Sequence, residues 1–419
     1  GLINEATIDR SVKRLFTARM KLGMFDPEDN VPFASIPVEK VRCPEHIALA
    51  RRMARESMVL LKNNGVLPLR KDLNRVVVVG PNADNKAALY ANYNGFSPEM
   101  VTPLDGILQA VSAGAYVEPF EGCDLFRDEP VTDRDFGTSG RHERGEVDVI
   151  VAVLGYTAEL EGEEGSASKA EVKGDRVRIG LPGRQLELLK RLRETGKPVV
   201  LVVLSGSAVD LAEAEPLADA ILYAWYPGEQ GGHAIADVLF GDYNPAGRLP
   251  VTIVRSLDQL PDFQDYAMKG RTYRFMTDEP LYRFGYGLSY TTFAYANLNV
   301  SGGPRDAAGA HRGTLETWAV SVDVTNTGER DGDEVVQLYV ADLAASVPVP
   351  RHHLEAFRRV RLKAGETQTV AFELRPRQLA CYDDEGKPFV EAGEFRISVG
   401  GGQPDDPSAA AVSAMLRLG

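Results

Sequence analysis

The sequence predicts an α/β fold, in which a mostly parallel-sheet α/β sandwich domain is followed by an all-β sandwich of the fibronectin type III-like (immunoglobulin-like) kind. Two observations predict this order. Between about residues 46 and 255, continuous Val, Leu and Ile runs alternate with helical patterns, as in parallel sheets that are buried on both faces. From about residue 313 the apolar residues alternate with polar ones, which is typical of half-buried strands.

The composition limits the class of protein. At 419 residues the chain is too long for one hydrophobic core, so two or three domains are expected. A net charge of -13 argues against nucleic acid and anionic membranes as partners. No apolar stretch approaches the roughly 18 residues of a membrane span. The three cysteines are far apart and odd in number, so free thiols are expected rather than disulfides or a zinc site.

The first 25 residues predict an isolated amphipathic helix. Asn4 or Thr7 could cap it, and Gly23 ends it. Its apolar positions recur mostly at a spacing of three or four: Ile8, Val12, Leu15, Phe16, Met20 and Leu22. Residues 26–45 are rich in proline and polar residues and are expected to be a linker. A lone helix before a linker implies a packing partner on its N-terminal side, and residue 1 is not expected to be a native start.

Residues 46–255 predict the α/β domain. Helices are expected at 46–62, 103–113, 182–195, near 211 and at 231–240. Strands are expected at 75–80, 116–121, 147–154, 198–204 and 220–226. Residues 256–312 are expected to connect this domain to the all-β domain at 313–419, whose strands are separated by turn signals.

An acidic loop follows the expected strand at 147–154 and carries Glu159, Glu161, Glu163 and Glu164. Open α/β sheets usually bind ligands at the carboxyl ends of their strands. Repulsion among neighbouring carboxylates can raise the pKa of one of them, so that it donates a proton near neutral pH. The alternative is a solvated acidic loop without chemistry.

Other site classes have weak support. The loop after Gly80 lacks the glycine spacing of a dinucleotide site, and no phosphate-binding P-loop pattern occurs. The six histidines form no ligand pair at helical spacing. Ser205 is not in a nucleophile elbow. We therefore expect no cofactor and no metal.

Several joined motifs resemble glycoside hydrolase family 3, in that family's order and through essentially the whole chain. They are ESMVLLKNNGVLPL (56–69), VVGPNAD (78–84), NYNGFSPEMVTPLDGI (92–107), EGCD (121–124), ELEGEE through GDR to LPGRQ (159–185), YPGEQGGHAIADVLFGDYNPAGRLPVT (226–252) and LYRFGYGLSYTTF (281–293). The resemblance implies that residues 1–25 are the last helix of a (β/α)8 barrel otherwise missing from this sequence. It also implies that residues 46–255 are the family's α/β sandwich domain.

The resemblance further implies a retaining exo-acting β-glycosidase, with an Asp nucleophile on the barrel and a Glu acid/base on the sandwich domain. The nucleophile motif, Ser-Asp-Trp, is absent, since the only tryptophans are Trp225 and Trp318. Aligned with the family's Glu-x-Glu loop, Glu163 is the expected acid/base. Glu164 is the second choice and Glu161 the third.

Glu161, Tyr93 and Asn94 are expected to contact substrate, and Arg176 to hold the loop rather than the sugar. A two-carboxylate mechanism implies that this chain is inactive without the barrel. The substrate would be a β-glycoside or oligosaccharide, with the NYNG and TPLDGI motifs closer to β-xylosidases than to β-glucosidases. The alternative is a non-catalytic carbohydrate-binding or accessory module with the same fold. The sequence leaves the compartment open.

Overall fold

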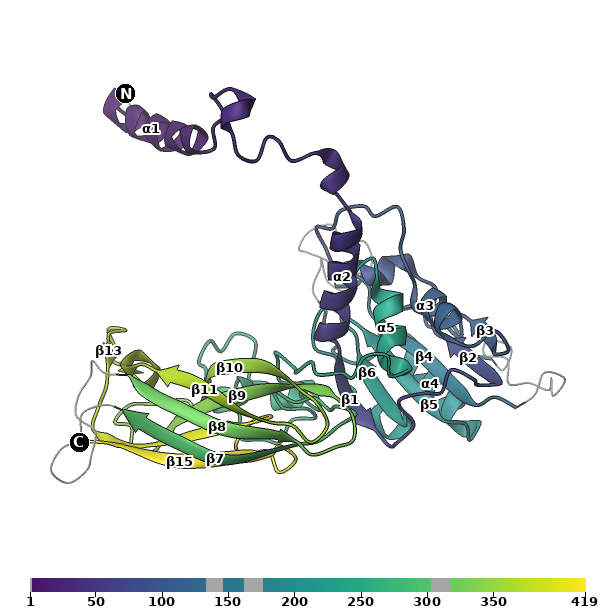
Figure 1. Cartoon of the computed structure of the whole chain (residues 1–419). Helices are drawn as coiled ribbons and strands as arrows, with labels where there is room; N and C mark the ends of the chain where they lie inside the picture. The colour runs from purple at the N-terminus through teal and green to yellow at the C-terminus, as the bar shows by residue number, and fades with distance from the viewer. Residues whose placement is uncertain (1, 133–145, 162–175, 303–316) are drawn as a thin grey trace. The chain divides into compact units, whose positions relative to one another are not determined.

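A computed structural model describes residues 2–132, 146–161, 176–302 and 317–419. The chain divides into two compact units, residues 1–49 and residues 50–419, which are described separately (Figure 1). No helix in the described ranges is long and apolar enough to cross a bilayer.

The first unit contains the predicted amphipathic helix, α1 (Glu5–Lys21). Its N-cap is Asn4, whose side chain accepts a hydrogen bond from the Thr7 amide at 2.9 Å, so the predicted helix and one of its two predicted caps are confirmed. No residue of α1 is buried, and Leu15 and Met20 on the apolar side are 54% and 61% exposed. Two short 3-10 turns, Glu28–Asn30 and Val38–Lys40, follow in the proline-rich segment.

The second unit begins within α2 (Pro44–Ser57) and contains a six-stranded sheet in the order β1-β6-β5-β4-β2-β3. The strands are β1 (Val59–Asn63), β2 (Arg75–Val79), β3 (Tyr116–Phe120), β4 (Val149–Gly155), β5 (Val199–Leu204) and β6 (Ala220–Tyr223). All neighbours pair in parallel except β1, which is antiparallel to β6 at one edge. The predicted mostly parallel sheet is therefore confirmed.

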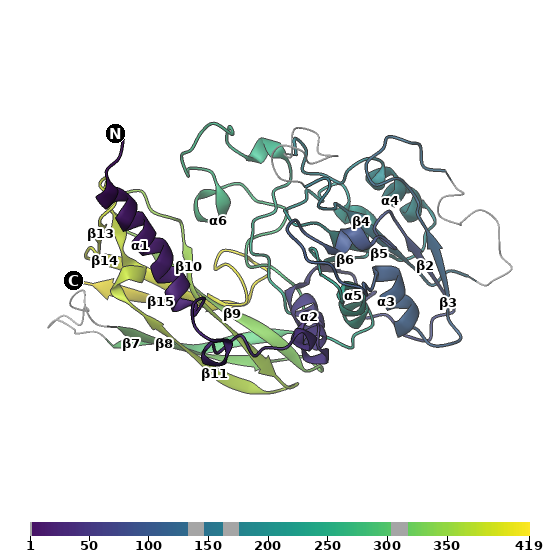
Figure 2. The ribbon, with the colours of Figure 1, turned by 90° about the horizontal axis from the view of Figure 1, so that it is seen from above.

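Helices cover both faces of the sheet, because alternate residues of each central strand enter one of two separate cores. One core includes residues of α2, α3 (Pro103–Ala110) and α5 (Gly231–Leu239), and the other includes residues of α4 (Gln185–Glu194). Figure 2 shows α3 and α5 on one side of the strands and α4 on the other. This burial on both faces explains why the strands read as unbroken apolar runs.

Glycines allow α3 and α5 to cross in direct backbone contact. A Cβ atom at Gly106 would lie 2.0 Å from the Gly232 carbonyl oxygen, and one at Gly232 would lie 1.9 Å from the Thr102 carbonyl oxygen. Both glycines lie in motifs that carried the resemblance, TPLDGI and YPGEQGG. These motifs therefore encode helix packing as well as any function.

One predicted helix is confirmed but shorter than expected, and another is wrong. The one expected at 46–62 ends at Ser57, and the residues after it form β1, because Met58, Leu60 and their neighbours are buried from both sides of the sheet. The helix expected near Leu211 is a series of turns with one 3-10 segment, Glu215–Leu217. Pro216 lacks the backbone N–H that an α-helix interior would use.

The C-terminal region forms the predicted all-β sandwich. One sheet has the order β10-β9-β14-β15 and the other β11-β8-β7, with a small β12-β13 hairpin. The strands are β7 (Phe293–Gly302), β8 (Trp318–Asn326), β9 (Gly332–Asp342), β10 (His353–Leu362), β11 (Thr367–Leu374), β12 (Cys381–Tyr382), β13 (Pro388–Phe389), β14 (Gly393–Gly400) and β15 (Ala411–Leu418). Inward residues of both sheets, Trp318 among them, form a third core. Strand β7 lies in the segment expected to be a connection, yet it pairs with β8.

A buried ion pair joins the α/β domain to the sandwich within the second unit. Arg248 donates to the Glu334 carboxylate at 2.8 Å, and their side chains are only 9% and 2% exposed. The Tyr295 hydroxyl donates to the other Glu334 oxygen at 2.9 Å. Nearby, the Gln337 side chain donates to the Gly285 carbonyl at 3.0 Å. The two domains are thus linked by groups that are withdrawn from water.

Candidate active site

Polar groups gather where the parallel strands β4, β5 and β6 reach their carboxyl ends. The chain leaves β4 through Tyr156 and Thr157, β5 through Ser205–Ser207, and β6 through Trp225 and Tyr226. Parallel neighbours end at the same edge of a sheet, so these three exits come together. The acidic loop starts from the first of them.

Glu161 is the best-defined acidic residue of that loop. Its Oε1 atom accepts hydrogen bonds from the Ser205 hydroxyl at 3.0 Å and from the Ser207 hydroxyl. Its Oε2 atom accepts from the Gly206 amide at 2.7 Å and from the Tyr226 hydroxyl. The side chain is only 10% exposed. Both carboxylate oxygens are therefore fully engaged by the ends of β5 and β6.

Arg176 lies at the other described end of the loop and reaches the same turn. Its Nη2 atom donates to the Ser207 hydroxyl at 2.7 Å and to the Ala208 carbonyl at 3.0 Å. Its Nη1 atom lies 3.4 Å from Glu161 Oε1, and the guanidinium sits 4.4 Å from the centre of the Tyr156 ring. These contacts agree with the prediction that Arg176 holds the loop, although its role toward substrate stays untested.

Two phenols complete the cluster, the buried Tyr223 and the half-buried Tyr226. Burial raises the pKa of Tyr226 well above 10, and the Glu161 carboxylate raises it further. Burial likewise raises the pKa of Tyr223, whose hydroxyl donates to the Ser207 carbonyl at 2.5 Å. Both phenols therefore stay protonated at physiological pH and act as hydrogen-bond donors. No local pattern in the sequence pairs Tyr226 with Glu161, and its place at the end of an expected strand was the available signal.

Glu163 and Glu164, the predicted acid/base and its second choice, lie outside the described residues. Their roles stay predictions. The prediction that Glu161 contacts substrate also stays untested, and the donors around its carboxylate point to a different role. Glu159 is exposed at the start of the same loop.

The predicted substrate-binding residues Tyr93 and Asn94 come directly after Asn92, which contacts the acidic loop. The Asn92 side chain donates to the Glu161 carbonyl at 3.2 Å, across an interval that sequence reasoning did not connect. Tyr93 has a φ of 58° and is 90% exposed. The Asn94 side chain donates to the Ala91 carbonyl at 3.0 Å. The loop that carries Tyr93 is therefore tethered to the start of the acidic loop, and the role of Tyr93 toward substrate stays a prediction.

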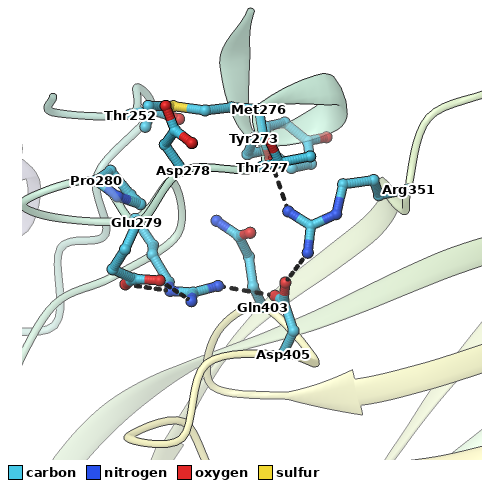
Figure 3. Close-up of a pocket in the computed structure, with 11 residues that line it drawn as sticks. Thr252, Tyr273, Met276, Thr277, Asp278, Glu279, Pro280, Arg351, Gln403 and Asp405 are labelled. Atoms are coloured by element: carbon cyan, nitrogen blue, oxygen red, sulfur yellow. Dashed lines mark hydrogen bonds and ion pairs between the residues drawn. The ribbon is translucent and has the colours of Figure 1, made fainter. Parts of the chain in front are cut away.

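A separate pocket of about 280 Å³ lies between the connecting segment and the sandwich (Figure 3). Asp405 is its central charge. Arg351 Nη2 lies 2.8 Å from one of the Asp405 oxygens and Arg283 Nη1 lies 2.9 Å from the other. Arg283 also pairs with Glu279. Because these charges neutralise one another, we assign them to packing of the segment against the sandwich.

One grouping of potential metal ligands occurs among the described residues, formed by Asp342, Cys381 and Glu391. The Cys381 sulfur lies 3.5 Å from an Asp342 oxygen and 3.6 Å from a Glu391 oxygen, so its single S–H can donate to either. Burial, helped by these carboxylates, raises the pKa of the Cys381 thiol to about 12. The thiol contacts therefore hold these three side chains together in this structure. None of the three cysteines forms a disulfide, as predicted.

Comparisons with known proteins agree with the motifs. Residues 58–290 match the family model of the glycosyl hydrolase family 3 C-terminal domain, and residues 334–403 match that of a fibronectin type III-like domain. A periplasmic β-glucosidase of Salmonella typhimurium is 34% identical over 96% of this chain and 54% of its own length. A β-xylosidase of Formosa agariphila is 35% identical over 95% of this chain and 54% of its own length.

Solved structures give the same result. A β-glucosidase from Erythrobacter marinus superposes with a TM-score of 0.82 and 36% identity, over 100% of this chain and 56% of that one. A β-glucosidase from Listeria innocua gives a TM-score of 0.81 and 28% identity, over 100% and 56%. The chain thus spans about half the length of the relatives that it matches.

Proposed function

Because the chain belongs to glycoside hydrolase family 3, we propose that it is the C-terminal part of a retaining exo-acting β-glycosidase and supplies its acid/base carboxylate. The observation that carries the proposal is the acidic loop at the carboxyl edge of the family's C-terminal domain, tethered at Glu161. The similar proteins are named as β-glucosidases and β-xylosidases, so terminal β-linked glucose or xylose is the proposed substrate.

In this proposal Glu163 protonates the glycosidic oxygen while an Asp on the absent (β/α)8 barrel attacks the anomeric carbon. A covalent glycosyl-enzyme forms and the aglycone leaves as an alcohol. Glu163, now ionised, removes a proton from water, which attacks the anomeric carbon and releases the sugar with its configuration retained. Glu164 is the second candidate for this role. Tyr93 and Asn94 are proposed to contact the substrate from the neighbouring loop.

The partner domain follows from the chemistry. Retaining glycosidases place their two carboxyl groups about 5 to 5.5 Å apart, and the sequence has no Ser-Asp-Trp motif to supply the nucleophile. The apolar side of α1 is exposed, which is what the last helix of a barrel would show without its neighbours. We therefore expect the 419-residue chain alone to hydrolyse no glycoside.

The test compares Glu163→Gln with Glu164→Gln in an enzyme that contains the barrel. An acid/base variant should lose roughly 10²-fold or more in kcat on a natural disaccharide. It should lose less on a dinitrophenyl glycoside, whose leaving group needs no proton. Azide should speed breakdown of the glycosyl-enzyme of that variant and give a glycosyl azide. If Glu164→Gln behaves this way and Glu163→Gln does not, the assignment moves to Glu164. Turnover by the 419-residue chain alone would refute the two-domain proposal.

A further inference from the structure

We propose that Glu161 is a positioning residue, whose carboxylate fixes the point from which the acid/base segment leaves the sheet. This inference rests on the proposed function for its catalytic consequence. The anchoring itself rests on geometry, because donors from two neighbouring strand ends hold the carboxylate.

The donors that hold Glu161 come from residues next to buried strands of the sheet. Ser205 directly follows β5, whose residues are all buried, and is itself 0% exposed. Tyr226 is three residues beyond β6, and its pKa, raised chiefly by burial, keeps the donated proton in place. The Gly206 amide adds a donor that no side-chain rotation can remove. Donors of three kinds therefore converge on one carboxylate.

Gly206, Tyr226 and Glu161 are closely packed. A Cβ atom at Gly206 would lie 2.8 Å from the Tyr226 ring and 3.3 Å from Glu161 Oε2. The turn thus fits the carboxylate against the phenol only with glycine at this position. A site that is fitted this closely defines the orientation of Glu161 and of its backbone.

The Glu161 carboxylate already accepts four hydrogen bonds, which favours a positioning role over a catalytic one. Ser205 and Ser207 occupy one oxygen, and Gly206 and Tyr226 occupy the other. Neither oxygen is free to bind a sugar hydroxyl or to deliver a proton to a leaving group. The carboxylate therefore serves to hold residue 161, two positions before the proposed acid/base.

Arg176 provides the same restraint from the C-terminal end of the segment. It donates to Ser207 and lies against Glu161, so Arg176 and Glu161 both contact the turn that follows β5. A shift of about 1 Å in a catalytic group can cost about 10²-fold in rate. Loss of the Glu161 anchor should therefore appear in the proton-transfer step rather than in substrate affinity.

The catalytic arm uses Glu161→Gln and Tyr226→Phe in the barrel-containing enzyme. Glu161→Gln should lower kcat on a β-linked disaccharide about 10²-fold and on a dinitrophenyl glycoside less than about tenfold, with KM within about threefold. Tyr226→Phe removes one donor and should lower disaccharide kcat about tenfold. Tyr290→Phe is the matched control, since it removes a phenol that donates to the Val238 carbonyl at 2.8 Å, and should leave kcat unchanged.

The pH profile distinguishes positioning from direct catalysis. With Glu161→Gln the basic limb of kcat/KM should persist, because the acid itself is still present. Loss of that limb would make Glu161 the acid/base and overturn the proposal. An equal loss on both substrates would show a general folding defect and also overturn it. If Glu164→Gln rather than Glu163→Gln removes the limb, the catalytic assignment fails while the anchoring role stands.

A structural arm needs no activity. In the 419-residue chain, Glu161→Ala should speed hydrogen exchange of the Gly206 amide at least tenfold, because that N–H loses its side-chain acceptor. Tyr290→Phe should leave the exchange of this amide unchanged. Unchanged exchange in Glu161→Ala would overturn the anchor even if the enzyme proves to be a glycosidase.

Discussion

Replacing Arg248 with methionine should cost about 3 kcal/mol of unfolding free energy. The change leaves the Glu334 carboxylate, 2% exposed, without its cationic partner at 2.8 Å. Breaking a buried ion pair on one side typically costs 3 to 5 kcal/mol. The lower end applies because the Tyr295 hydroxyl still donates to Glu334 at 2.9 Å.

The loss should depend on pH. Burial raises the pKa of Glu334 even with Arg248 present, and removal of the guanidinium raises it further. A raised folded-state pKa means that the unfolded chain releases its proton first. Below a pH of about 4.3, the pKa of this carboxyl in the unfolded chain, Glu334 is protonated in both states and does not change the free energy of unfolding. As the pH rises from there toward the higher pKa of Glu334 in the folded protein, the free energy of unfolding falls. The Arg248→Met penalty should be larger at pH 7 than at pH 4.

Urea unfolding followed by tryptophan fluorescence can measure this loss domain by domain. Trp225 reports on the α/β domain and Trp318 on the sandwich, and they are the only two tryptophans. Changing one of them to phenylalanine isolates the other. If the pair couples the domains, Arg248→Met should separate the two transitions or lower both midpoints.

Two control variants test whether the loss comes from the buried charge of Glu334. Arg417→Met removes a surface partner of Glu394, where the side chains are 71% and 46% exposed, and should cost less than about 0.5 kcal/mol. The double variant Arg248→Met/Glu334→Leu should cost less than Arg248→Met alone, since no uncompensated charge remains. A penalty below about 1 kcal/mol for Arg248→Met, or additive losses in the double variant, would refute the reasoning.

Three further predictions follow from buried groups and close contacts. Cys381, with a pKa of about 12, should react with iodoacetamide at pH 8 roughly 10³-fold more slowly than an ordinary thiol. Mass spectrometry can compare it with Cys43 and Cys123, and comparable rates in the native state would contradict the raised pKa. Burial lowers the pKa of His352 in the folded protein. Below about pH 6.5, the ordinary histidine pKa, the unfolded chain therefore takes up a proton first, and the free energy of unfolding should fall. His352→Gln should reduce that fall in urea titrations at pH 7 and pH 5, and an unchanged fall would exclude His352 as its source. Gly232→Ala should cost about 3 kcal/mol by overpacking, because its Cβ would lie 1.9 Å from the Thr102 carbonyl oxygen. Gly114→Ala, with nothing within 4 Å of its Cβ, should be neutral by thermal unfolding, and equal losses in the two variants would contradict the packing argument.

Strands buried on both faces were predictable because only an unbroken apolar run satisfies such an environment. Strand β5 (Val199–Leu204) is an example. The same signal was misread in β1, where the apolar run follows a true helix without an intervening glycine or proline. Periodicity alone does not separate a short buried strand from a buried helix end. Pro216 was a visible stop signal for the helix wrongly expected near Leu211.

The acidic loop could be recognised as a candidate site, but its attachment could not. Glu161 meets Ser205 and Tyr226 across 44 and 65 residues of chain, and such long-range partners leave no local pattern. Asn92 reaches the Glu161 carbonyl across 69 residues. Only the order of strands in the sheet brings these residues to one edge.

Joining both ends of the acidic segment at Ser207 has a consequence for how this scaffold can diverge. When the ends of a loop are fixed to each other, doubling its length adds only about 0.6 kcal/mol of closure entropy. Insertions between Glu161 and Arg176 would therefore leave the sheet beneath them undisturbed. Selection could therefore lengthen or rewrite this segment at almost no cost to folding.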